Sequence, residues 1–143
     1  MAFVLVLSVS ASSPKARYID HGNGTATDNS TGLMWTRDTQ QIPGRLAWHE
    51  ALNACDNLSY AGHDNWRLPQ VKELQSLIDY GRENLPGLPT ENPFINVQSW
   101  YYWSSTANTF ITNSAWSVDM HYGHPWYHDK SYDFYVWCVR GGQ

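Results

Sequence analysis

The amino-acid sequence predicts a single α+β domain in which two helices pack against antiparallel strands joined by long loops. Two segments, 46–58 and 70–81, carry apolar residues at helical spacing. Two other segments, 17–35 and 101–140, consist of short strand-like runs separated by turn residues. The length of 143 residues is that of one domain with its own core.

Residues 1–13 are set apart from the domain, which we expect to span residues 14–143. They begin with an apolar run that ends in small residues, as a signal peptide does before its cleavage site. They lack the basic residues with which a signal peptide begins. Two interpretations remain open: a clipped signal segment, or an N-terminal edge strand of the domain.

Residues 17–35 predict a hairpin followed by a further strand. Gly22 and Gly24 supply the backbone freedom that the first turn needs, and residues 28–32 form a second turn. The oxygen-bearing side chains of this region belong to Asp20, Asn23, Asp28 and Asn29. Their spacing does not match a calcium-binding loop, and such side chains in turns usually bond to their own backbone. We therefore favour turns over a calcium site.

Residues 46–58 predict the first helix. Trp48, Ala51, Leu52 and Cys55 recur at the spacing of one helix face. This face should pack on the core, and Cys55 should point inward with it.

Residues 70–81 predict the second helix. Pro69 stands at its start and Gly81 just past its end, which is the usual asymmetry of helix termini. Its expected buried stripe consists of Val71, Leu74 and Ile78.

The segments on either side of the second helix are expected to be irregular. Before it, Arg67 is predicted to be half-buried, either stacked on a ring or paired with Asp64. After it, residues 82–99 contain several prolines and cannot form a regular element. Long ordered loops in small domains tend to carry function or to pack beneath it.

Residues 101–105, 114–122, 126–133 and 135–140 predict the strands of the C-terminal part, with a turn at Gly123. Strand alternation separates two faces of each run. The outward faces are expected to carry Ser117, Asp119 and His121 on one strand, and Tyr135 and Trp137 on the last strand. Cys138 is expected to point inward.

More than half of the Trp, Tyr and Phe residues of the chain lie between Trp100 and Trp137. Some of these rings must fill a core, but Trp126 and Tyr127 stand beside the turn residues Gly123 and Pro125. Large rings in loops provide contact area at low cost in conformational entropy. We therefore interpret this stretch mainly as a binding surface, with an aromatic core as the alternative.

The composition limits the classes of partner. The net charge is −4, with 9 basic and 13 acidic residues. Nucleic acids and sulfated polyanions require a basic surface, so both are disfavoured. No run of about 20 apolar residues is present, so we expect no membrane insertion of the domain.

The two cysteines, Cys55 and Cys138, allow two interpretations. They are not arranged as a CxxC pair, which argues against structural zinc. They would form one disulfide in an exported protein, or remain two separate buried thiols in a cytosolic one.

Two kinds of reactive site can be considered within the aromatic stretch. His121, His124 and His128 have helical rather than strand spacing, and the neighbouring glycine and proline prevent a helix, so we expect no metal site. A hydrolase that uses two carboxylates could draw on Asp119, Asp129 and Asp133, but nothing in the sequence sets their separation.

Six motifs occur in the order of a known family: DHGNGTATDNSTGLMW, WHEALNACDNL, GHDNWRLPQVKELQSLID, YYWSST, AWSVDM and VWCVRGG. Together they cover about residues 17–142. On these motifs the chain resembles the C-terminal domain family of the Legionella collagen-like adhesin, the Lcl C-terminal domain family.

This resemblance implies a C-type-lectin-like fold, with two helices packed on a twisted antiparallel sheet and with long loops. C-type lectins join the first helix to the last strand by a disulfide, and Cys55 and Cys138 occupy the matching places. The resemblance therefore implies that these two cysteines are paired. It brings no catalytic residues and no cofactor.

The resemblance also implies a non-enzymatic recognition module that is exported to the cell surface, and the adhesin relative suggests a homotrimer. Some relatives are variable proteins of diversity-generating retroelements, in which the C-terminal region changes to bind new targets. Family members commonly carry a basic residue before the last cysteine, where this chain has Trp137. That difference argues further against sulfated glycosaminoglycans.

We expect a protein or other cell-surface target, with a glycan as the alternative. A catalytic domain like the formylglycine-generating enzymes would need reactive cysteines, and is the least favoured interpretation. The expected contact set consists of the outward side chains Ser117, Asp119, His121, Tyr122, His124, Trp126, Tyr127, His128, Asp129, Tyr132, Asp133, Tyr135 and Trp137.

Overall fold

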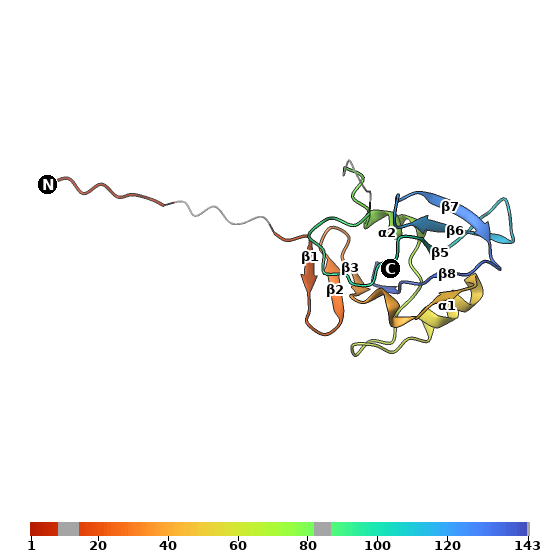
Figure 1. Ribbon diagram of the computed structural model, residues 1–143. Coiled ribbons are helices and arrows are strands. Elements are labelled where there is room, and N and C mark those ends of the chain that lie inside the picture. The colour runs from red at the N-terminus through yellow and green to blue at the C-terminus, as the bar shows by residue number, and fades with distance from the viewer. Residues whose placement is uncertain (9–14, 82–86, 143) are drawn as a thin grey trace.

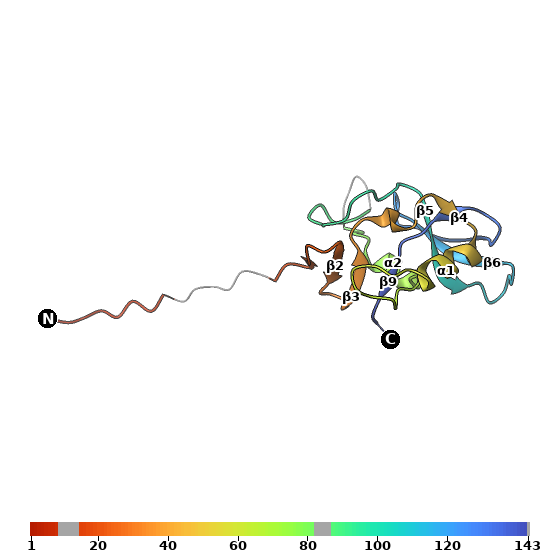
Figure 2. The ribbon, with the colours of Figure 1, turned by 90° about the horizontal axis from the view of Figure 1, so that it is seen from below.

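The computed structural model describes residues 1–8, 15–81 and 87–142. Residues 1–8 contain neither helix nor strand and lie away from the rest of the described chain, with exposed apolar side chains (Figures 1 and 2). The edge strand that was one alternative for residues 1–13 is therefore not seen over residues 1–8. Residues 9–13 lie outside the described part of the chain.

Over the described ranges, two sheets and two α-helices make up an α+β fold that is consistent with the C-type-lectin-like fold. The first sheet has the order β1–β2–β3–β9, and its strands span Tyr18–Asp20, Thr25–Asp28, Leu33–Thr36 and Val139–Arg140. The second sheet has the order β4–β8–β5–β6–β7, and its strands span Arg45–Leu46, Phe134–Tyr135, Tyr101–Ala107, Ser114–Asp119 and Pro125–Asp129. All strand pairs are antiparallel except β5 with β8.

The predicted hairpin forms β1 and β2, and the further strand forms β3. Gly22 and Gly24 have φ angles of 71° and 90°, a conformation that costs glycine little. Asp20 accepts a hydrogen bond from the Gly22 N–H at 2.9 Å, and Asn23 accepts one from the Thr25 N–H at 3.1 Å. These side chains thus stabilise their own turn, as the sequence interpretation favoured over a calcium site.

Asp28 anchors the second turn. Its carboxylate accepts a hydrogen bond from the Ser30 N–H at 2.9 Å and pairs with Arg17 at 2.9 Å. Burial raises the pKa of Asp28, but the hydrogen bonds from Arg17 and Ser30 more than offset this and leave the pKa below its usual value. Arg17 also donates to the Ser76 carbonyl, so this pair joins the first sheet to the end of the second helix.

The first helix, α1, spans Trp48–Asp56 and buries Trp48, Ala51 and Cys55, as its spacing predicts. An additional 3-10 turn, η1, precedes it at Thr39–Gln41. Neither α-helix in the described ranges has the length and apolar content needed to span a bilayer.

The second helix, α2, spans Val71–Ser76, so the prediction that it continues up to Gly81 is wrong. The N–H groups of Leu77 and Ile78 bond to carbonyls three residues back, which tightens the last turn. The Asp79 N–H then bonds to the Gly87 carbonyl at 2.8 Å and leaves the helical pattern. Contact with the following loop ends the helix before Gly81.

The predicted loop after α2 is irregular where it is described. Residues 87–99 form neither a helix nor a named strand, and residues 82–86 lie outside the described part. Ile95 fixes the loop to the first half of the chain: its N–H donates to the Arg37 carbonyl and its carbonyl accepts from the Thr39 N–H.

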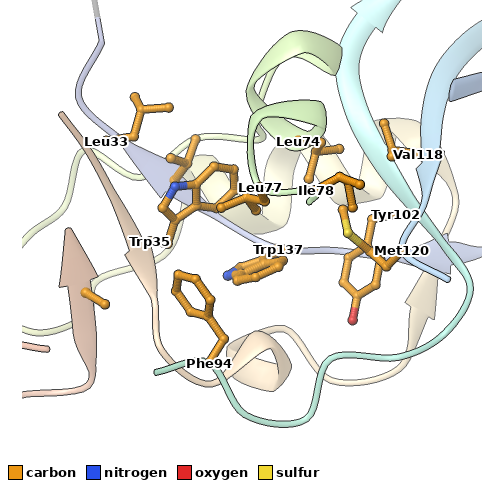
Figure 3. Close-up of a cluster of buried hydrophobic side chains, with 12 residues drawn as sticks. Leu33, Trp35, Leu74, Leu77, Ile78, Phe94, Tyr102, Val118, Met120 and Trp137 are labelled. Carbon is orange, nitrogen blue, oxygen red and sulfur yellow. The ribbon is translucent and has the colours of Figure 1, made fainter. Parts of the chain in front are cut away.

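The core consists of two clusters on opposite faces of the second sheet. Tyr102 and Val118 belong to the cluster under α2, and Figure 3 shows these side chains meeting others from β3 and α2 near Trp137. Trp103 and Ala115 belong to the other cluster, which packs against α1. Both faces of β5 and β6 are therefore covered.

This two-sided packing corrects the expected outward face of β6. Ser117 and Asp119 are buried rather than outward-facing. The Ser117 hydroxyl donates to the Trp126 carbonyl at 3.0 Å, and Asp119 accepts a hydrogen bond from the His121 N–H at 2.8 Å. Alternation along the strand separates the two faces correctly, but it does not reveal that both are covered.

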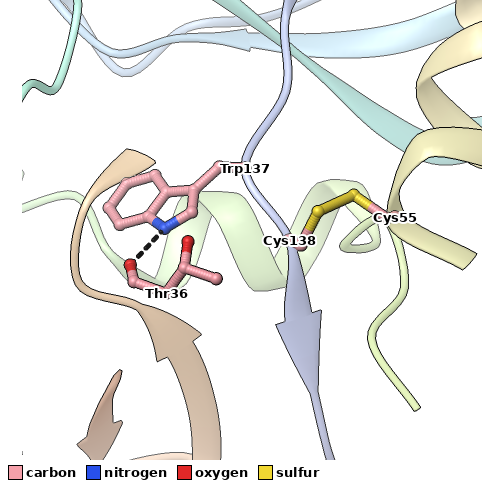
Figure 4. Close-up of a disulfide and its surroundings, with 4 residues drawn as sticks. All are labelled: Thr36, Cys55, Trp137 and Cys138. Carbon is pink, nitrogen blue, oxygen red and sulfur yellow. Dashed lines mark hydrogen bonds between the residues drawn. A yellow bond between two sulfur atoms is a disulfide. The ribbon is translucent and has the colours of Figure 1, made fainter. Parts of the chain in front are cut away.

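The last strand-like run is split between the two sheets. β8 pairs with β4 and β5, whereas β9 pairs with β3. The expectation that Trp137 faces outward is therefore wrong: its ring has 0% exposure and packs against Trp35 and Phe94. Its Nε1–H donates to the Thr36 carbonyl at 2.9 Å (Figure 4).

Cys55 and Cys138 form the disulfide that the family resemblance implies, with a Cα–Cα distance of 5.5 Å (Figure 4). The bond joins α1 to the residue directly before β9. It therefore ties the helix on one face of the second sheet to the strand that completes the first.

Arg67 is held by a carboxylate, but the partner is Glu73 in α2 rather than Asp64. Two nitrogens of the guanidinium donate to the two oxygens of Glu73 at 2.7 and 2.8 Å. The guanidinium also donates to the Gly141 carbonyl at 2.6 Å. Arg67 thus connects α2 to the residues that follow β9. The prediction that Arg67 stacks on an aromatic ring or pairs with Asp64 is wrong.

Candidate functional site

The aromatic stretch supplies both core and surface. Tyr102, Trp103, Phe134 and Trp137 are buried. The exposed rings of the same stretch are Trp100, Phe110, Tyr122, Trp126 and Tyr132. Both interpretations of this stretch are thus partly realised, and the surface rings other than Phe110 lie on β7 or beside the ends of β5, β6 and β8.

The expected contact set divides into three groups by exposure. Ser117, Asp119 and Trp137 are buried, as described above. The half-buried members are His121, Tyr127, His128, Asp129 and Tyr135. The exposed members are Tyr122, His124, Trp126, Tyr132 and Asp133.

Three members of this set line one hollow in the surface. This hollow, the aromatic groove, has a volume of about 460 Å³. Its lining consists of Arg45, Trp100, Tyr101, His128, Tyr132, Asp133 and Phe134. The lining side chains come from β4, β5, β7 and β8 and from the residues beside them, so the strand order of the second sheet creates the groove.

His128 reaches the groove across β6. Ala115 lies opposite it in the ladder, and this small side chain leaves room for the imidazole ring. The ring packs 4.6 Å from Tyr101 and 4.7 Å from Phe134, measured between centroids. Tyr101 and Phe134 thereby form the floor of the groove together with His128.

Trp100 and Tyr132 form the rim. Their exposures are 49% and 54%, whereas Phe134 below them is buried. Trp100 meets Tyr101 edge-on at 5.3 Å, and Tyr132 meets Phe134 edge-on at 6.2 Å. The floor rings therefore orient both rim rings, which restricts their motion before any ligand arrives.

Burial lowers the pKa of His128 below its usual value. Its Nε2 atom is buried and has no hydrogen-bond partner among the described residues. A charged imidazole would need such a partner, so the neutral ring is favoured. At neutral pH the floor of the groove is therefore uncharged.

Arg45 and Asp133 bring opposite charges to the groove. Both residues are exposed. Neither side chain forms an ion pair or hydrogen bond with any residue that the structure describes. Two polar groups are thus available to a ligand in a hollow that is otherwise mostly aromatic.

The turn between β6 and β7 presents a second group of rings beside the groove. The Gly123 N–H donates to the Asp119 carbonyl at 2.6 Å, and the Tyr80 hydroxyl donates to the Gly123 carbonyl at 2.6 Å. Gly123 has a φ of 76°, and a Cβ there would lie 2.7 Å from Ile78. This fixed turn holds the rings of Tyr122 and His124 stacked at 6.0 Å.

The carboxylates considered for hydrolysis serve local structure in two of three cases. Asp119 accepts from the His121 N–H, as noted above. Asp129 accepts from Ser131 and Asn113, and the hydrogen bonds from Ser131 lower its pKa. Asp133 lies in the groove. Within the described ranges, no group of three His, Cys, Asp or Glu side chains is arranged to hold a metal ion.

The sequence interpretation missed part of the groove. Trp100 and Tyr101 belong to the aromatic stretch, and their proximity to the contact set was a usable signal. Nothing in the local sequence around Arg45 predicts that it lines the groove, because its position there depends on the pairing of β4 with β8.

Comparison with known proteins agrees with the family resemblance. The family model of the Lcl C-terminal domain matches residues 24–140. This range includes both helices, the disulfide and the whole aromatic groove. No curated protein matches the chain.

Proposed function

Because this chain belongs to the Lcl C-terminal domain family, which is adhesin-related, we propose that it is a non-enzymatic module that recognises a target on a cell surface. The target is a protein or a glycan, and it is bound through the aromatic groove and the adjoining rings of β7. The disulfide supports an extracellular location, because such bonds persist in oxidising compartments.

The observation that carries this proposal is the set of large exposed rings in the aromatic groove and on β7. Trp100, Trp126 and Tyr132 are each about half exposed, although an indole or phenol ring gains free energy by leaving water. Exposed rings that gather in this way mark interaction sites on soluble proteins. They also dominate the energy of measured interfaces when a partner covers them.

The rigid scaffold supports the same proposal. The disulfide and the two-sided core hold the strands that carry the rings, so little order has to be gained on binding. The exposed side chains Tyr122, His124 and Trp126 can be exchanged without disturbing the core. That tolerance is the property that a diversified binding face, as in a retroelement variable protein, requires.

The test uses the labelled wild-type protein and a Trp100→Ala/Trp126→Ala variant, titrated on cultured epithelial cells and on a glycan array. We expect the double variant to lose at least tenfold in affinity, because two contact rings are removed. Its melting temperature should remain close to that of the wild type, because both rings are half exposed.

Phe110→Ala is the matched control, because Phe110 is 94% exposed and lies outside the groove. It should leave both binding and stability unchanged. Equal binding by the wild type and the double variant would show that the aromatic surface is not the recognition site.

A further inference from the structure

We propose that the aromatic groove binds the ring of a neutral pyranose sugar, which stacks on the rim ring of Trp100 and bonds through its hydroxyls to Arg45 and Asp133. This inference rests on the proposed function, since it names the ligand class of the same site. It follows from the uncovered faces of the rim rings, from the opposite charges of Arg45 and Asp133, and from the volume of the groove.

The rim rings have faces that no other ring covers by stacking. Trp100 makes only an edge-on contact with Tyr101 among the rings of the described residues. Tyr132 meets its two ring neighbours at 46° and 90°. Trp126 differs, because its indole lies nearly parallel to Tyr127, at 11° and 5.4 Å. An unstacked face suits the C–H-rich face of a pyranose, which is flat and weakly polar.

The two charged residues select a neutral polyol. A sugar hydroxyl can donate to the Asp133 carboxylate and can also accept from the Arg45 guanidinium, so one ligand satisfies both. A purely apolar ligand would remove water from these groups and replace none of their hydrogen bonds. An anionic ligand would be attracted by Arg45 but repelled by Asp133, and a cationic ligand the reverse, so neither gains favourable contacts with both residues.

The size of the groove is compatible with a sugar. Its volume of about 460 Å³ lies within the range of about 300–1,000 Å³ that small-molecule sites occupy. The hollow is formed at the surface between two rim residues that are half exposed, so a single sugar stays partly in water. We therefore expect a millimolar dissociation constant for a monosaccharide, with higher affinity for a chain that presents several units.

The experiment is an NMR titration of the isotope-labelled full chain. The neutral probes are methyl α-D-mannopyranoside, methyl β-D-galactopyranoside and methyl N-acetyl-β-D-glucosaminide. N-acetylneuraminic acid and glucosamine are the anionic and cationic comparators. We expect at least one neutral probe to shift the Trp100 indole N–H and the Asp133 amide signals saturably, with at least tenfold higher affinity than either charged probe.

Three variants identify the site. Trp100→Ala and Asp133→Asn should each weaken binding of the neutral probe, the first by at least tenfold. Phe110→Ala should bind like the wild type. Wild-type affinity in Trp100→Ala would overturn the inference, and so would stronger binding of a charged probe or the absence of saturable shifts at the groove with all neutral probes.

The result on cells separates this inference from the proposed function. If no neutral probe binds but the Trp100→Ala/Trp126→Ala variant still loses cell binding, the sugar assignment is wrong and the recognition surface stands. If that variant keeps its cell binding, the proposed function is contradicted whatever the sugar titration shows.

Discussion

Trp137 and Trp126 lie close together in the sequence, but they serve the protein in different ways. Trp137 is enclosed and bonded to the Thr36 carbonyl, whereas Trp126 is 55% exposed. Both stand in an aromatic run near the end of the chain, so residue type alone cannot separate a core ring from a surface ring. The difference arises from which elements lie on either side of each ring.

The first prediction concerns Trp137. We expect Trp137→Ala to reduce the free energy of unfolding by about 4 kcal/mol, because it leaves a large cavity and an unpaired Thr36 carbonyl. We expect Trp126→Ala to change it by no more than about 0.5 kcal/mol. Urea unfolding of both variants measures the difference, and similar losses would contradict the assigned packing.

The second prediction concerns His128, whose pKa is lowered by burial from the usual value of 6.5. In the unfolded chain the imidazole takes up a proton as the pH falls below 6.5, whereas the folded protein resists protonation. The contribution of His128 to the free energy of unfolding is therefore fully present above the unfolded-state pKa. It is lost as the pH falls through the lowered folded-state pKa.

Urea midpoints at pH 7.5 and pH 5 test this prediction. The wild type should be less stable at pH 5, and His128→Gln should show a smaller difference between the two values. The groups that line the groove with His128 include the ionisable Tyr101, Tyr132, Arg45 and Asp133. Exposed His124→Gln is the control, and it should retain the wild-type difference.

At the scale of elements, local turns were predictable and distant pairings were not. The turns at Gly22 and at residues 28–32 depend on side chains that bond within a few positions. The early end of α2 depends on Gly87, and the partner of Arg67 depends on where α2 starts. Sequence reasoning identified these elements, but it could not determine the contacts that end or connect them.

The same distinction explains the candidate site. The aromatic stretch predicted His128, Tyr132 and Asp133, because they lie within one segment. Arg45 joins them only because β4 pairs with β8, and no local pattern specifies that pairing. The burial of Ser117 also required knowledge of what covers both faces of β6.

The third prediction concerns the link between Arg67 and α2. Burial raises the pKa of Glu73, but the hydrogen bonds from Arg67 and the Gln70 N–H lower it below its usual value overall. We expect Arg67→Met to cost about 2 kcal/mol, because the largely buried carboxylate loses two charged hydrogen bonds.

A double-mutant cycle with Glu73→Gln isolates this contribution. The double variant should be more stable than the sum of the two single losses predicts, because a neutral amide at position 73 leaves no unpaired charge. The oxygen of that amide can still accept the hydrogen bond from the Gln70 N–H that begins the helix. Strict additivity of the two losses would show that the pair is not coupled.

At the scale of the whole molecule, one covalent bond joins the two halves of the fold. The Cys55–Cys138 disulfide closes a segment with a sequence separation of 83. By the chain-entropy model, a loop of this length stabilises the folded state by about 4 kcal/mol. Most of this effect comes from restricting the unfolded chain.

The fourth prediction follows from that loop. We expect Cys55→Ala/Cys138→Ala to lose about 4 kcal/mol of unfolding free energy in urea, with the fold retained at low denaturant. A reducing agent should lower the midpoint of the wild type towards that of the double variant. It should leave the double variant unchanged, and an equal midpoint for the two proteins without reductant would contradict the entropic account.

The last two strands, β8 and β9, belong to different sheets, and this has a consequence for how the protein folds during synthesis. The Trp137 indole bonds to a carbonyl 101 positions earlier, and Cys138 pairs with a thiol on α1. The first hairpins therefore emerge from the ribosome long before β8 and β9 can complete either sheet. In the exported protein that we propose, this order leaves both sheets incomplete until the last residues have emerged, and the disulfide can then form in an oxidising compartment.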